Sequence, residues 1–154
     1  MHVRDGAAAS DDLSLDAFIG SATVVDVSSL DGEIPFEKVA GVLANVACER
    51  LLLKTGRSIA AGTFPESWPT LSLDCAQRLL QRGLRLLGVD CPSVDVRESK
   101  KLTVHHTLFS GSASILENLD LRAVNPGRYE LIAVPVKLKG LDAAPVRAVL
   151  RELT

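Results

Sequence analysis

Two short apolar runs constrain the fold of this chain more than any other feature. They cover Arg50–Thr55 and Arg85–Asp90, and each reads as a buried strand followed by a loop. Between them, apolar residues recur at helical spacing from Leu73 to Leu80, with Ser72 placed to cap the start and Gly83 to end it. Strand, helix and strand in this order are typical of a crossover unit with parallel strands. The sequence therefore predicts an α/β fold.

The rest of the chain continues the alternation of strands and helices. We expect strands over 23–28, 113–117 and 129–138, helices over 34–46 and 104–110, and loops over 1–12, 56–70 and 91–101. Pro135 lies inside the third of these strands, which indicates an edge strand or a bulge. The tail around 145–151 fits a closing strand or a helical turn.

Composition narrows the class of protein. The chain has 154 residues, 47% of them hydrophobic and 23% charged, which is typical of one globular domain spanning 1–154. A net charge of −2 with no basic stripe argues against a nucleic-acid partner. No apolar run reaches the roughly 18 residues of a membrane span, and the N-terminus is polar. We therefore expect a cytoplasmic protein with no membrane partner.

The cysteines support a reducing environment. The chain has three, at positions 48, 75 and 91, with no C-x-x-C pair. This pattern fits reduced thiols better than a disulfide framework or a zinc ribbon. Cys91 follows Asp90 in an expected loop, and the favoured interpretation is an unreactive thiol.

Glu117 is the most unusual residue of the sequence. With Asn118 it interrupts an apolar run that extends from Ile115 to Leu121 and otherwise reads as buried. A buried carboxylate needs a partner, and an imidazole such as His105 or a metal ion would serve. Twelve residues separate the histidine from the glutamate, so spacing alone is a weak indication of a metal site.

Other groupings of polar residues are weaker still. Ser93, Asp95 and His105 could form a catalytic triad, but no nucleophile-elbow glycines flank the serine. Asp90 and Asp95 follow a strand, where α/β proteins place functional side chains, although capping of the loop backbone is at least as good an interpretation. His106 is expected on the surface of its helix or as a residue that supports a site residue without contacting a ligand.

Five blocks of sequence, in order, resemble the kynurenine formamidase branch of the metal-dependent cyclase family. The resemblance extends over nearly the whole chain and ends in Pro145-Val-Arg-Ala-Val-Leu. The blocks are Arg50-Leu-Leu-Leu-Lys-Thr, Gly88-Val-Asp-Cys-Pro-Ser-Val-Asp, His105-His-Thr-Leu-Phe, Ile115-Leu-Glu-Asn-Leu-Asp-Leu and Tyr129-Glu-Leu-Ile-Ala-Val-Pro-Val-Lys-Leu.

The resemblance implies a swivelling β/β/α-type domain with a mixed sheet flanked by helices. It also implies hydrolysis of a small formamide substrate, N-formyl-kynurenine, to kynurenine and formate. The family site holds divalent metal, usually zinc and often a pair of ions. His105 and Glu117 match two of the family's metal ligands. Members commonly form homodimers or larger oligomers.

The sequence departs from the family at its N-terminus. The family's other metal ligands lie in a motif His-x-Gly-Thr-His-x-Asp-x-Pro-x-His, and His2 aligns with its last histidine, the general acid/base. The remaining positions of the motif and the strands before it have no counterpart here. We therefore expect an N-terminally truncated domain with little activity of its own. Two alternatives are a hydrolase of another small or cyclic amide, such as isatin, and a non-catalytic binding or interaction module.

Overall fold

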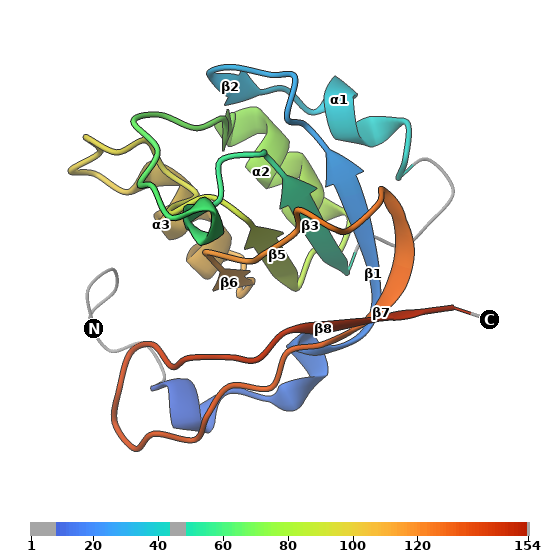
Figure 1. The fold of residues 1–154 in the computed structure, drawn as a ribbon. Helices are drawn as coiled ribbons and strands as arrows, with labels where there is room; N and C mark the ends of the chain where they lie inside the picture. Colours follow the sequence, from blue (N-terminus) through green and yellow to red (C-terminus); the bar gives the residue numbers. More distant parts are fainter. Residues whose placement is uncertain (1–8, 44–48, 154) are drawn as a thin grey trace.

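A six-stranded mixed sheet forms the centre of the protein (Figure 1). The structure is a computed structural model and describes residues 9–43 and 49–153. The sheet order is β6-β5-β3-β1-β7-β8, in which the first four strands are parallel and the last two antiparallel. The strands are β1 (Ile19–Asp26), β3 (Arg50–Lys54), β5 (Leu86–Val89), β6 (Ser114–Leu116), β7 (Gly127–Ile132) and β8 (Val149–Glu152). The predicted α/β class with a mixed sheet is confirmed.

Within the described residues, three α-helices accompany the sheet: α1 (Glu37–Ala40), α2 (Leu73–Gln81) and α3 (Thr103–Ser110). Short 3-10 turns lie at η1 (Ser10–Asp12), η2 (Leu15–Ala17) and η3 (Ile59–Ala61), and β2 (Glu33–Ile34) pairs with β4 (Thr70–Leu71) in a small second sheet. The predicted caps of α2 are confirmed, since Ser72 Oγ accepts the Cys75 N–H at 3.1 Å and Gly83 has a φ of +88°. Among the described helices, none combines the length and apolar character needed to cross a lipid bilayer.

The sheet separates two apolar cores. Leu51 and Leu53 of β3 face the core that contains residues of α1, α2 and α3, whereas Leu52 faces the other core, with Phe18 and the buried end of β7. Strands covered on both faces read as continuous apolar runs, which explains the pattern of β3 and β5. The close packing of β3 against β5 leaves no room for a side chain at position 88, since a Cβ on Gly88 would lie 2.3 Å from Leu52 Cδ2.

The helix predicted over 34–46 is wrong in its first part. Ile34 belongs to β2 and pairs with Leu71, while the helix itself is limited to Glu37–Ala40. Positions 44–46 lie outside the described residues. Two expected loops also contain regular structure, because η1 falls within 1–12 and the loop over 56–70 holds η3 and the first residue of β4. Apolar periodicity did not distinguish a buried two-residue strand from the first turn of a helix.

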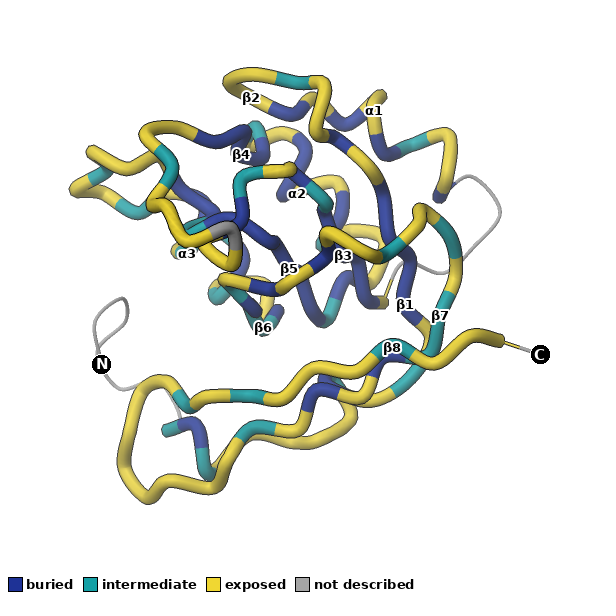
Figure 2. The backbone as a smooth tube through the Cα atoms, in the orientation of Figure 1, coloured by how far each residue is buried: buried dark blue, intermediate teal, exposed yellow. Residues whose placement is uncertain are grey.

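The strand predicted over 129–138 is shorter than expected. β7 ends at Ile132 and lies between β1 and β8, so it is not an edge strand. Pro135 lies beyond it and makes only an isolated antiparallel bridge with Val146, consistent with a residue that cannot donate to a ladder. The tail forms the edge strand β8, as one of the two interpretations predicted. Strands β7 and β8 and the residues that connect them, 133–148, form an extended arm (Figures 1 and 2).

Candidate metal and acid–base site

His105 is held at the start of α3 by Asp95. Leu102, the residue before the helix, has a φ of 46° and provides no side-chain cap. The Asp95 carboxylate caps the helix instead, accepting the Val104 N–H at 3.0 Å and the His105 N–H at 3.1 Å. A residue eight positions before the first residue of the helix therefore satisfies two of its free N–H groups.

The two ring nitrogens of His105 face two carboxylates. Nδ1 lies 2.7 Å from Asp95 Oδ2, and Nε2 lies 3.3 Å from Glu117 Oε1. The side chain of Asp95 is 6% exposed, that of His105 12% and that of Glu117 28%. The three side chains thus form a line from the protein interior toward solvent.

Glu117 is positioned by the loop that carries Asp95. Its Oε1 accepts the Val94 N–H at 2.9 Å. On the other side, Asn118 N–H donates to the Cys91 carbonyl and Leu119 N–H to the Val89 carbonyl, both at 3.1 Å. The chain after β6 is therefore tied to the end of β5, which brings Glu117 to His105. The expectation that this carboxylate has a partner is confirmed.

The electrostatics of His105 favour a charged imidazole. Burial is the largest single influence and lowers its pKa, but the hydrogen bonds and charges of Glu117 and Asp95 together outweigh it. The net result is a His105 pKa above its ordinary value of 6.5. Two carboxylates around one imidazole attract positive charge, whether a proton or a metal ion.

The geometry also fits two ligands of one metal ion. Ligands at ~2.0–2.1 Å from a tetrahedral ion lie roughly 3.3 Å apart, so the measured separation of 3.3 Å between Nε2 and Oε1 suits a shared ion. Asp95 on Nδ1 leaves Nε2 as the coordinating nitrogen, as in many metal-bound histidines. Over 9–43 and 49–153, no group of three or more His, Cys, Asp or Glu is arranged to hold a metal, so these residues supply two donors.

Two other predicted residues fall outside this arrangement. A third, His2, lies outside the described residues. His106 is exposed on α3, as expected. Ser93 does not complete a triad, because its Oγ accepts the Asp95 N–H at 3.2 Å and serves the local turn. The predicted Asp95–His105 part of that triad is nevertheless a real contact.

Asp90 has a structural role near the site. Its carboxylate is 1% exposed and accepts the Thr55 N–H at 2.8 Å, the Thr55 hydroxyl and the Gly56 N–H at 3.0 Å. The ends of β3 and β5 are joined by these bonds. Backbone capping is therefore the correct interpretation for Asp90, whereas Asp95 both caps a helix and contacts the site.

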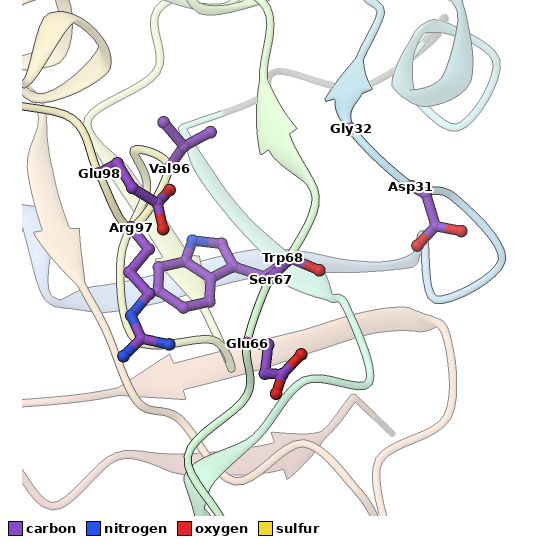
Figure 3. Close-up of a pocket in the computed structure, with 8 residues that line it drawn as sticks. All are labelled: Asp31, Gly32, Glu66, Ser67, Trp68, Val96, Arg97 and Glu98. Carbon is purple, nitrogen blue, oxygen red and sulfur yellow. The ribbon is translucent and has the colours of Figure 1, made fainter.

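A hollow of about 270 Å³ is lined by residues 31–32, 66–68 and 96–98 (Figure 3). Its walls include the Trp68 indole and the side chains of Val96 and Arg97, and neither His105 nor Glu117 lines it. Trp68 Nε1 donates to the Asp95 carbonyl at 2.9 Å. Sequence reasoning missed this bond, and a lone tryptophan inside the loop over 56–70 carries no signal that would have revealed it.

Comparison with known proteins identifies the family of this chain. A family model described as "Putative cyclase" matches residues 1–96, more than half of the chain. The chain belongs to the cyclase family. Kynurenine formamidase from Salinibacter ruber is 42% identical over 153 residues, covering 99% of this chain and 72% of that protein. Kynurenine formamidase from Bacillus anthracis is 44% identical over 146 residues, covering 92% and 67%.

Solved structures of cyclase-family hydrolases have the same fold. One described as a potential metal-dependent hydrolase with cyclase activity has a TM-score of 0.83 at 29% identity, covering 99% of this chain and 75% of that one. An isatin hydrolase bound to a product analogue, thioisatinate, has a TM-score of 0.77 at 20% identity, covering 90% and 62%. At 20% identity the second likeness concerns the fold alone.

Proposed function

We propose that this cyclase-family chain is a metal-dependent amide hydrolase that converts N-formyl-kynurenine to kynurenine and formate. The observation that carries the proposal is the His105–Glu117 pair, with Nε2 and Oε1 3.3 Å apart and Nδ1 occupied by Asp95. Identity of 42–44% to curated kynurenine formamidases supports this substrate class.

A divalent ion would be held by His105 Nε2 and Glu117 Oε1. Zinc is the first choice, because members of the family usually hold zinc, often as a pair of ions. When bound, such an ion lowers the pKa of a water ligand to about 7 and polarises a carbonyl oxygen. A catalytic zinc normally has three protein ligands. Since the described residues supply two, the proposal includes weak metal binding by this chain alone.

The proton transfers are assigned to His2. In hydrolysis, the water oxygen bonds to the formyl carbon, the C–N bond breaks, and formate and the arylamine leave. His2 would take a proton from the water and deliver it to the arylamine nitrogen. This role rests on the resemblance of His2 to the last histidine of the family motif.

A non-catalytic binding module is the second candidate. The presence of only two metal donors in the described residues favours it. Exposed apolar side chains on the arm, including Val136 and Leu141, would suit an association surface. A homodimer and a cytoplasmic location remain predictions under either function.

Metal titration of the full chain and of Glu117→Gln tests the proposal. The variant keeps the size of the side chain and can still accept the Val94 N–H, but it lacks the charge that a cation needs. We expect substoichiometric zinc after purification, measurable affinity on titration, and at least a tenfold loss of affinity in Glu117→Gln. Hydrolysis of N-formyl-kynurenine, followed by kynurenine absorbance, should fall with it.

Glu152→Gln on the exposed edge strand β8 is the matched control and should leave affinity and activity unchanged. Equal zinc affinity in wild type and Glu117→Gln would contradict the metal site. Absence of both zinc binding and hydrolysis in the wild-type chain would favour the binding module.

A further inference from the structure

Asp95 serves more N–H groups than a helix cap requires. Its Oδ1 accepts the Val104 N–H at 3.0 Å, while its Oδ2 accepts the His105 N–H at 3.1 Å and lies 2.7 Å from His105 Nδ1. The side chain is 6% exposed, so water cannot readily replace these partners. Only a carboxylate, with acceptor sites on both oxygens and no donor, satisfies three such groups at once.

The arrangement fixes which ring nitrogen carries a proton. With Asp95 accepting at Nδ1, a neutral His105 has its hydrogen there and its lone pair on Nε2, toward Glu117. The adjoining Val94 N–H holds Glu117 Oε1 at 2.9 Å. Two consecutive residues, Val94 and Asp95, thus set the direction of both candidate metal donors.

We infer that Asp95 is a positioning residue that selects the Nδ1–H tautomer of His105 and aims its Nε2 at the cation site shared with Glu117. The inference deepens the proposed function and, as far as metal binding is concerned, rests on it. The tautomer itself does not depend on a metal, so it can be tested separately. Asp95 acts through His105 and does not touch the reacting atoms.

The loop that carries Asp95 is itself anchored. Trp68 Nε1 donates to the Asp95 carbonyl at 2.9 Å, and the Asp95 N–H donates to Ser93 Oγ at 3.2 Å. Both backbone groups of the residue are therefore occupied, and its carboxylate is aimed without relying on the histidine. Such preorganisation is what a supporting residue must provide.

Asp95→Asn and Asp95→Ser separate positioning from capping. Asp95 caps α3 from a separate loop, so capping depends on the reach of its side chain. Asparagine has the reach of aspartate, and its one oxygen can still accept a helix N–H, but it cannot accept from all three groups because its other position is a donor. Serine is too short for the helix N–H groups and for the ring, so we expect α3 to persist in Asp95→Asn and to be weakened in Asp95→Ser, while the hold on Nδ1 is lost in both.

The first measurement is ¹⁵N NMR of the His105 ring in the metal-free chain, at alkaline pH where the ring is neutral. The wild type should be mainly Nδ1–H, and both variants should shift toward Nε2–H. The second is zinc titration, with a loss of affinity of ~10–100-fold expected for supporting residues of metal-bound histidines.

Ser72→Ala is the matched control, since it removes the side-chain cap of α2 and lies outside the site. It should lower thermal stability yet leave the His105 tautomer and zinc affinity unchanged. Wild-type tautomer and affinity in both Asp95 variants would overturn the inference while leaving the proposed function intact. A shifted tautomer in a chain that binds no zinc would support the positioning role and remove the metal function.

Discussion

The parallel and antiparallel halves of the sheet differ in how they are covered. Every residue of β5 is buried, as are the first four of β3, whereas β8 has three exposed residues out of four (Figure 2). The parallel strands have an apolar core on each face, while the β7–β8 arm is covered on one side and ends in an edge. The candidate site adjoins the parallel half, where packing on both faces restricts the backbone. Such a half suits a site whose geometry must be held within a fraction of an ångström.

The sharpest test of this difference is one substitution made in both halves. Leu87→Ala in β5 removes a fully buried side chain and should lower the free energy of unfolding by about 3 kcal/mol. Leu141→Ala removes the same atoms from a side chain that is 47% exposed on the arm and should cost less than about 0.5 kcal/mol. Urea unfolding of both variants measures the two values. Equal losses would show that the arm is packed as tightly as the parallel half.

The same difference explains which strands the sequence predicts well. β3 and β5 were located to within a residue because burial on both faces requires a continuous apolar run, with a polar residue where the strand ends. The strands of the arm are covered on one face only, so they do not need a continuous apolar run. Val134 and Val136 are β-branched and favour a strand, but Pro135 between them lacks an N–H, so the ladder of β7 stops at Ile132.

Arg50 ties the N-terminal turn to the parallel half and provides the next test. Its guanidinium, 5% exposed, donates through Nε to the Ala17 carbonyl at 2.9 Å and through Nη2 to the Asp16 carbonyl. Gly20 has a φ of +134°, and a Cβ there would lie 2.9 Å from Arg50 Nη1. The buried guanidinium therefore holds the N-terminal turn against the sheet.

Arg50→Met keeps the apolar stem of the side chain but leaves those carbonyls without a donor. It should lower the free energy of unfolding by about 2 kcal/mol. Arg122→Met, which breaks an exposed pair with Asp120, should leave the unfolding midpoint unchanged. Hydrogen exchange would locate the loss at η2 and the start of β1. A midpoint unchanged in both variants would mean that other contacts hold the N-terminal turn to the parallel half.

The site was only half predictable from the sequence. The resemblance to the family singles out both His105 and Glu117. Glu117 also stands out without it, because its carboxylate interrupts an apolar run. Their approach could not be derived from spacing, because it depends on the ends of β5 and β6 being neighbours. The sequence does not distinguish capping from a role at the site for Asp95, and in the structure the same carboxylate caps α3 and contacts His105. A helix that begins at the site needs a cap beside it, so the two roles are not alternatives.

Cys91 lies in the buried half, close to Asp90, and gives the smallest expected effect. Burial above all, with the nearby charge of Asp90, raises the pKa of its thiol from 9.0 to about 12. A thiol that keeps its proton in the folded state but loses it when unfolded stabilises the fold below pH 9, and this contribution is lost as pH rises toward 12. Between about pH 8 and 10 the wild type should lose ~1 kcal/mol more than Cys91→Ala. The difference is read from urea unfolding of both proteins across that range. Parallel pH profiles would show that the thiol ionises as readily in the fold as in the open chain, and that water reaches the parallel half near the site.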